Sequence, residues 1–206
     1  MSLPIGSNPN TTALLIIECQ TGVVGRDSVL PALAEAAAPV LPIINRLAAG
    51  ARDAGVLVAH LLYLPVADNR SSNRKPPMQR FVAPQMADWT PGHPATHVVP
   101  EIETAETDLV LVRHSGLSPV HSTETFEVLR NIGITTLVLA GVSTNIAIPV
   151  SATGAVDEGF DVIVPRDAVA GTPPEHHEGM LDHTIRMLAT MTTTDELLEA
   201  WKPASR

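Results

Sequence analysis

The sequence predicts a doubly wound α/β domain, in which helices bury a parallel sheet. Three observations support this prediction. Short apolar, β-branched runs recur along the chain, and stretches with apolar residues at helical spacing separate them. Three of the helical stretches end in a glycine directly before the next apolar run, at Gly55-Val56, Gly133-Ile134 and Gly159-Phe160. Helices that stop at a glycine and pass straight into a strand are typical of βαβ units.

The apolar runs predict the strands. In chain order they are Thr12–Ile17, Val56–Leu62, Leu109–Val112, Thr136–Ala140, Asp161–Val164 and the weaker Ala189–Thr193. Most of them are continuously apolar rather than alternating. Continuous runs suit strands that are buried on both faces, as in a parallel sheet.

Four stretches between these runs have helical features. They are Val29–Ala54, Ser122–Ile132, Ser143–Glu158 and Pro173–Leu188. Each of the first three stops at one of the glycines named above, which suits a C-cap. The fourth begins with proline and glutamate, which favour a first helical turn.

The composition indicates one large domain and excludes several classes of function. Of the 206 residues, 45% are hydrophobic and 17% charged, so we expect a single domain over residues 1–206. The chain has 13 basic and 22 acidic residues, and its net charge of −9 repels phosphate backbones, so nucleic acid is not an expected partner. The single cysteine, Cys19, excludes an internal disulfide and a multi-cysteine metal site but leaves a role as nucleophile open.

Two stretches, Ala67–Arg80 and Ala83–Asp108, interrupt the alternation of runs and helices. Together they form a connection of roughly 40 residues between the second and third expected strands. Long connections inside compact domains are often lids or binding loops. A solvated excursion over the surface, or a contact between subunits, fits the sequence equally well, so both interpretations stay open.

A site is expected where the strands end, because doubly wound sheets bind ligands beyond the carboxyl ends of their strands. Polar residues follow four of the expected strands, namely Glu18, Arg113, Ser143 or Asn145, and Asp167. These groups can converge at one edge of the sheet, which makes that edge the default site.

Three segments carry a resemblance to a known family. They are ALLIIECQTGVV, WTPGHPATHVVPEIETAETDLVLVR and GITTLVLAGVSTNIAIPVSATGAVDEGFDVIVPRDAVAG. The first is similar to an apolar strand that ends in Asp-x-Gln, the second to a run that leads into a strand ending in lysine, and the third to a Gly-Val-x-Thr-x-x-Cys-Val turn. All three patterns belong to the isochorismatase-like hydrolases, also called the cysteine hydrolase family. The resemblance spans nearly the whole chain and implies a three-layer α/β/α fold with a six-stranded parallel sheet, commonly in a homo-oligomer such as a dimer or tetramer.

The family's usual site consists of an aspartate, a lysine and a nucleophilic cysteine. Carried over position by position, the resemblance places Glu18, Arg113 and Ala147 there. A methyl group cannot attack a carbonyl carbon, so thiol chemistry is not expected at Ala147. Glu18 and Arg113 are therefore the candidate catalytic residues.

Cys19 is an unsuitable replacement for the missing thiol. Neighbouring side chains of a strand point to opposite faces, so if Glu18 faces the site, Cys19 packs against a helix. Free cysteines are usually buried and act as small apolar groups.

One thiol-free reaction is implied by the resemblance, that of the isochorismatases proper, which hydrolyse a vinyl ether. A carboxylic acid protonates the enol carbon there, and Glu18 is the expected acid. Arg113 would then hold a substrate carboxylate, although a close pair with Glu18 would keep that glutamate ionised. We therefore expect hydrolysis of a small carboxylated substrate. The alternative is a catalytically inactive member that binds a small acid or a protein partner, and an amidase with an unexpected nucleophile ranks last.

Candidate substrate-binding residues follow two of the strands. The imidazole of His114 binds or moves protons near neutral pH, although a structural hydrogen bond is its more common role. Backbone N–H groups in residues 141–145, at a helix start, suit an oxyanion or a carboxylate, whereas the side chains there can equally cap that helix. The resemblance implies an oxyanion hole here, beside a cis peptide at Val142–Ser143. The candidates are His114, Ser143, Thr144, Asn145 and Ala147.

No metal, cofactor or membrane contact is expected. Eight histidines invite a metal site, but most histidines in such patterns are solvated. No apolar run reaches about 18 residues without a charge or a proline, and residues 1–10 lack the pattern of a signal peptide. A cytoplasmic protein that acts on a small molecule is the resulting expectation.

Overall fold

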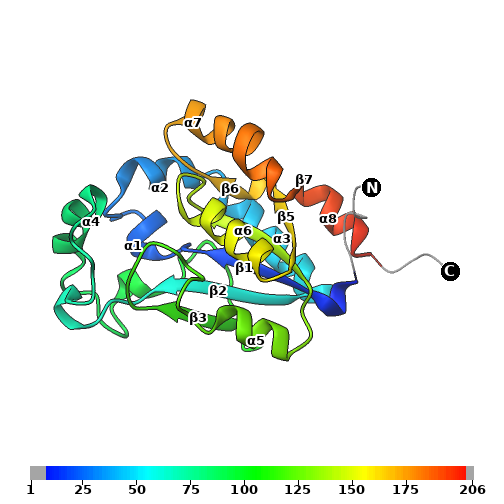
Figure 1. Ribbon diagram of the computed structural model, residues 1–206, viewed down its shortest axis with the longest axis horizontal. Coiled ribbons are helices and arrows are strands. Elements are labelled where there is room, and N and C mark those ends of the chain that lie inside the picture. Colours follow the sequence, from blue (N-terminus) through cyan, green and yellow to red (C-terminus); the bar gives the residue numbers. More distant parts are fainter. Residues whose placement is uncertain (1–7, 203–206) are drawn as a thin grey trace.

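In the computed structural model, which describes residues 8–202, a parallel sheet lies between helices (Figure 1). Its strands are β1 (Thr12–Ile17), β2 (Leu57–Tyr63), β3 (Leu109–Arg113), β4 (Thr136–Val142), β5 (Asp161–Pro165), β6 (Val169–Ala170) and β7 (Thr190–Thr192). Their spatial order is β3-β2-β1-β4-β5-β7, and the short β6 pairs with the end of β4. The predicted α/β fold is confirmed, with six ordered strands and one more, β6, that has no counterpart among the predicted strands.

The direction in which strands are added reverses between β1 and β4. From β1 the chain moves outward through β2 to β3, then returns to the other side of β1 and continues through β4 and β5 to β7. Ile16 of β1 is thus paired with His60 on one side and with Ala140 on the other. The carboxyl ends of β1 and β4 form a topological switch point, which is where open α/β sheets bind ligands.

Each of the four predicted helical stretches contains at least one helix, and within residues 8–202 three further helices lie outside those stretches. In chain order the helices are α1 (Thr21–Val24), α2 (Pro31–Ala37), α3 (Leu41–Asp53), α4 (Pro77–Val82), α5 (Thr125–Asn131), α6 (Ala147–Asp157), α7 (Pro174–Gly179) and α8 (Thr194–Ala200). The helix expected over residues 29–54 is divided into α2 and α3, because Pro39 and Pro42 disfavour a helix interior and Pro42 suits the first turn of α3. The stretch after α7 continues as a π-helical segment, Met180–Thr184, and a 3-10 turn, Ile185–Met187.

Two apolar clusters form the core, one on each face of the sheet. On one face Leu14 of β1 lies in a cluster with Leu47 of α3. On the other face Leu15 of β1 lies with Leu129 of α5 and Ile148 of α6. Successive residues of β1 thus alternate between the two clusters, as the pleat of a strand requires.

The connection between β2 and β3, residues 64–108, packs back onto the body of the protein (Figure 1). It contains α4, and Val98 within it forms an isolated bridge with Gln20. Trp89 anchors it, because this side chain is 2% exposed and a Cβ added to Gly22 would lie 2.2 Å from its ring. These contacts show that this part of the connection is packed against the domain and is not a solvated excursion along its whole length.

Among residues 8–202 no single helix is long and apolar enough to cross a membrane. By length and composition, α2 and α3 pass that test only as a pair bent by 56°. Leu33 of α2 and Ile44 of α3 are buried in the cluster on their face of the sheet.

Candidate functional site

A cavity of about 70 Å³, which we call the Glu18 cavity, lies at the carboxyl ends of β1, β3 and β4. Glu18 follows β1, Arg113 is the last residue of β3, and Ser143 and Ala147 belong to the turn between β4 and α6. Its apolar walls come from the segments on either side of it and include Val23, Leu30, Leu33, Met78, Val82 and Met86. Residues 78–86 belong to the connection after β2, so this connection covers the site.

Glu18 lines the cavity because the chain turns directly after β1. Its φ of 53° is a left-handed conformation that residues other than glycine rarely adopt, and its backbone N–H donates to the Leu61 carbonyl over 2.9 Å. Cys19 is 1% exposed and lies in the apolar cluster on the α3 face, so its predicted burial is confirmed. It shares that face with Leu14 and Ile16, because the left-handed turn at Glu18 ends the alternation of β1 from which the burial was predicted. Burial, together with the neighbouring Glu18 charge, raises the pKa of the Cys19 thiol to about 12. This thiol is therefore protonated at neutral pH and is unsuited to act as a nucleophile.

Arg113 forms an ion pair with Glu18 in this structure. Its Nη2 donates to the Glu18 carboxylate, and its Nη1 donates to the carbonyls of Gly116, over 2.6 Å, and Ser115, over 3.2 Å. The guanidinium carbon lies 4.4 Å from the centroid of the Tyr63 ring, an arrangement that favours a cation. The side chains of Arg113 and Glu18 are only 9% and 17% exposed. Both Nη groups thus have protein partners, whereas Nε is buried and has no hydrogen-bond partner among the residues that the structure describes.

The turn into α6 supplies the opposite wall of the cavity. The Val142–Ser143 peptide bond is cis, at the position that the resemblance implied. The Ser143 carbonyl accepts hydrogen bonds from the backbone N–H groups of Ile146 and Ile148. Ala147 is the first residue of α6, and it lines the cavity together with Ser143.

Thr144 and Asn145 do not line the Glu18 cavity. Thr144 is fully buried, and its Oγ1 lies 2.9 Å from Nδ1 of His177 in α7. Burial lowers the pKa of His177, opposed by the charge of Glu178. The Asn145 side chain accepts from the Thr172 N–H over 3.0 Å and donates to the Thr172 carbonyl. These bonds attach the turn to the segment after β6.

A wider pocket of about 420 Å³ adjoins the Glu18 cavity. The two share Leu30, Leu33, Met78, Ser143 and Ile146 as lining residues. Asn145 lines this adjoining pocket, as does Phe81, which is 64% exposed. A molecule too large for the Glu18 cavity therefore has space on this side.

His114 is directed away from both spaces. Its Nδ1 lies 2.6 Å from the Leu64 carbonyl, and the residue lines neither pocket. Two groups around the site had not been singled out from the sequence, Gln79 in the cavity wall and His177 behind Thr144. Neither lies in a recognisable motif. Both reach the site from helices that are remote in sequence from the ends of the strands, so no local pattern could have indicated them.

The charged and polar groups of the cavity define what it can do chemically. A carboxylate, a guanidinium, the Ser143 hydroxyl and a helix start meet there, which is a set suited to proton transfer and to stabilising negative charge. Within residues 8–202, no group of three or more His, Cys, Asp or Glu side chains is placed to hold a metal ion.

Gly171→Ala is expected to destabilise the protein by about 1–3 kcal/mol through overpacking at the turn into α6. A Cβ at Gly171 would lie 2.0 Å from Thr144 Oγ1 and 2.8 Å from Asn145 Oδ1. The measurement is the free energy of unfolding in urea. Gly179→Ala is the matched control, because a Cβ at that helical position meets nothing within 4 Å, and it should be neutral or stabilising. Equal stability of both variants would contradict the close approach at Gly171.

Comparison with known proteins places this geometry in context. The Isochorismatase domain family model matches residues 12–196. The chain is 28% identical over 198 residues to the uncharacterized isochorismatase family protein YecD of Escherichia coli O157:H7. The aligned region covers 94% of this chain and 97% of YecD. The chain is also 33% identical over 135 residues to maleamate amidohydrolase of Pseudomonas putida. That aligned region covers 64% of this chain and 60% of the enzyme. The structure of a cysteine hydrolase from Pseudomonas syringae pv. phaseolicola 1448A has the same fold, with a TM-score of 0.81 at 22% identity over 98% of both chains.

Proposed function

This chain belongs to the isochorismatase family, and we propose that it is a hydrolase that works without a cysteine nucleophile. In this proposal Glu18 transfers the proton and water replaces the thiol as nucleophile. The observation that carries it is the Glu18–Arg113 ion pair in the wall of a cavity that Ala147 also lines. We infer that Glu18, Arg113 and Ala147 stand at the positions of the family's acid, cation and thiol.

The ion pair supports a resting state in which Glu18 is a base. A neighbouring guanidinium favours the charged form of a carboxylate, and a carboxylate can accept a proton from water. Ala147 ends in a methyl group, which leaves space where a longer side chain would reach. A cavity of about 70 Å³ is large enough to admit water.

The start of α6 supports the second requirement of hydrolysis, which is stabilisation of negative charge on the reacting oxygen. Ala147 is the first residue of this helix, and the first N–H groups of a helix have no acceptor within it. Because the Ile148 N–H already donates to the Ser143 carbonyl and Pro149 has no N–H group, we propose that the Ala147 N–H donates to the developing oxyanion. Gly171, Thr144 and Asn145 would act indirectly, by holding the turn in place.

The substrate we propose is a small carboxylated molecule with a hydrolysable amide, ester or vinyl ether bond. The similarity to maleamate amidohydrolase supports an amide, since maleamate carries one carboxylate and one amide. Acid catalysis on a vinyl ether is supported less well, because Glu18 would first have to be protonated beside Arg113. The adjoining pocket of about 420 Å³ would accommodate the part of the substrate that is remote from the bond that breaks.

The test is hydrolysis of a panel of maleamate, isochorismate and a small carboxylated ester, with and without iodoacetamide. We expect turnover of at least one compound, and we expect it to survive the reagent because the only thiol, Cys19, is buried and protonated. Ala147→Cys introduces a thiol in the cavity wall, so this variant should become sensitive to iodoacetamide. Inactivation of the wild type by the reagent would contradict a thiol-free mechanism.

A second candidate function is binding without catalysis. Two observations favour it, the small volume of about 70 Å³ and the fact that both Nη groups of Arg113 already have protein partners. Such a protein would bind a small acid or a protein partner on the same scaffold. Absence of turnover for the whole panel would favour this candidate. The homo-oligomer implied by the family resemblance stays a prediction under either function. Sedimentation equilibrium would measure the oligomeric state.

A further inference from the structure

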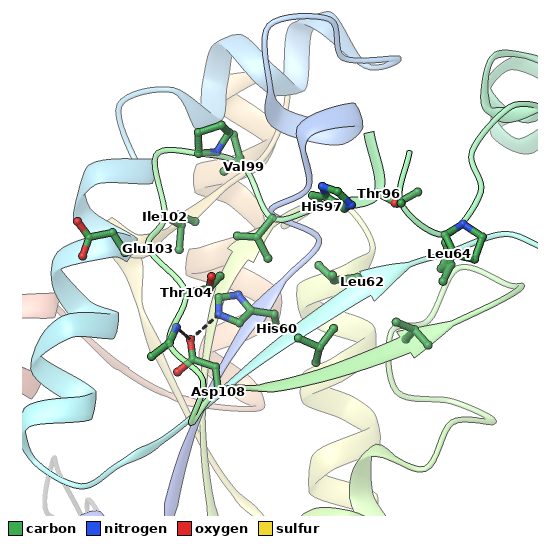
Figure 2. Close-up of a pocket in the computed structure, with 17 residues that line it drawn as sticks. His60, Leu62, Leu64, Thr96, His97, Val99, Ile102, Glu103, Thr104 and Asp108 are labelled. Carbon is green, nitrogen blue, oxygen red and sulfur yellow. Dashed lines mark hydrogen bonds and ion pairs between the residues drawn. The ribbon is translucent and has the colours of Figure 1, made fainter. Parts of the chain in front are cut away.

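A second, larger cavity, which we call the His60 groove, lies beside the edge strand β3 (Figure 2). Its volume is about 730 Å³, and it shares no lining residue with the Glu18 cavity. Side chains of β2 and β3 line one side, and residues 96–105 of the connection line the other. Sites for small molecules typically have volumes of about 300–1,000 Å³, so the groove has a suitable size.

The sheet side of the groove is apolar and open. Val110 and Val112 of β3 are 58% and 37% exposed, although valine is usually buried. Leu111, between them, points to the opposite face and is packed in the core. The two valines therefore form an exposed apolar surface, and the buried side chain of Leu62 in β2 lines the groove beside them.

Buried polar groups also line this groove, among them His60, Thr96 and the Asp108 side chain. His60 is fully buried, and its Nε2 lies 3.0 Å from Asp108 Oδ2. The same carboxylate accepts hydrogen bonds from Arg52 over 2.7 and 2.9 Å. Because a carboxylate accepts, Nε2 of His60 carries the ring hydrogen and Nδ1 presents a lone pair. Figure 2 shows the imidazole standing between β2 and the segment that carries Ile102 and Thr104.

Nδ1 of His60 is buried and lacks a hydrogen-bond partner in the part of the chain that the structure describes. Buried polar groups in native proteins are nearly always hydrogen-bonded, so an acceptor of this kind indicates a missing donor. Burial lowers the pKa of His60, opposed by the hydrogen bond and charge of Asp108, so the ring is neutral at pH 7. In the neutral ring Nδ1 carries no hydrogen, so it stays an acceptor that needs a donor from elsewhere.

We propose that the His60 groove binds a small, uncharged, largely apolar molecule that carries one hydroxyl or N–H group, which donates to Nδ1 of His60. The apolar part lies against Leu62, Val110 and Val112. The carboxylates of Asp108 and Glu103, which also line the groove, disfavour an anion. This ligand differs from the carboxylated substrate proposed for the Glu18 cavity, so the two sites can be tested separately.

Phenol is the probe, and toluene, in which a methyl group replaces the hydroxyl, is the matched control compound. Each is titrated into the full-length protein with labelled Leu and Val methyl groups, and the methyl and histidine ¹⁵N resonances are followed by NMR. We expect saturable shifts at Leu62, Val110 and Val112, and a five- to tenfold tighter Kd for phenol, roughly the effect of one hydrogen bond. The Nδ1 resonance of His60 should move with phenol and not with toluene.

Val110→Trp fills the groove from an exposed position and should weaken phenol binding by about tenfold or more. Val156→Trp is its control, because Val156 is 44% exposed on α6 and does not line the groove. Equal affinity for phenol and toluene, or phenol binding that survives Val110→Trp, would overturn the proposal. So would methyl shifts at Val110 and Val112 that depend on protein concentration and that phenol does not displace, because they would identify the groove as an interface between copies.

Discussion

Glu18→Gln is expected to lower kcat/KM by a factor of about 10² to 10⁴ for whichever compound of the panel the wild type hydrolyses, which is the usual effect of losing a general acid or base. Glutamine has nearly the size of glutamate, and its amide oxygen can still accept from Nη2 of Arg113. The cavity should therefore keep its shape, while the amide cannot take a proton from water. Steady-state kinetics measure the effect, and circular dichroism checks the fold.

Glu158→Gln is the matched control for this substitution. Glu158 forms an ion pair with Arg130, but the two side chains are 47% and 41% exposed. The same change of carboxylate to amide should leave kcat/KM unaltered and change the free energy of unfolding by no more than about 1 kcal/mol. A folded Glu18→Gln protein with wild-type activity would refute the role of Glu18 in proton transfer.

The direction of the pH dependence separates the two proton-transfer roles of Glu18. A base must be ionised, so kcat/KM should fall as the pH is lowered into the acid range. An acid must be protonated, so the same measurement would rise instead. The Glu18–Arg113 ion pair leads us to expect the fall. If kcat/KM for isochorismate rises as the pH is lowered, the result would instead support acid-catalysed hydrolysis of the vinyl ether.

Asp108→Asn is expected to lower the free energy of unfolding by about 3–5 kcal/mol at pH 7, as is usual when one partner of a buried ion pair is removed. The Asp108 side chain is 2% exposed and accepts from Arg52, His60 and the Ala105 backbone. An asparagine there keeps one oxygen and turns an NH₂ group toward those donors. Asp195→Asn is the control, because Asp195 pairs with Arg46 at an exposed site. This substitution should change the free energy of unfolding by about 1 kcal/mol or less.

The effect of Asp108→Asn should also depend on pH. Burial by itself raises the pKa of Asp108, but hydrogen bonds from Arg52, from the Ala105 backbone and from His60 lower it from 3.8 to about 2. A lowered pKa in the folded state stabilises the protein above the pKa of the unfolded state, and the contribution is lost as the pH falls toward the folded value. The difference in stability between wild type and variant should therefore shrink from about pH 4 toward pH 2. A difference that is constant from pH 7 to pH 2 would show that the carboxylate charge is not what stabilises the cluster.

The strands and most helices were predictable because local patterns determine them. The continuous apolar runs from Thr12 and Thr136 became β1 and β4, and helices end before the glycines at 55, 133 and 159. The division of α2 from α3 shows the limit of periodicity, since Pro39 and Pro42 outweigh apolar spacing that continues across them. The two-residue β6 is too short to leave any pattern in the sequence.

The sequence by itself determined the fold class and the edge of the sheet at which Glu18 and Arg113 lie, because each depends on periodicity or on where a strand ends. Only the tertiary structure decided the rest. Glu18 and Arg113 are 95 positions apart and pair because β1 and β3 end at the same edge, while Arg113 also bonds to the turn that follows it. The cover over the cavity, the His177 contact with Thr144 and the unpaired nitrogen of His60 have the same origin. Each arises between segments remote in sequence, where packing, not local preference, sets which groups meet and which are left without a partner.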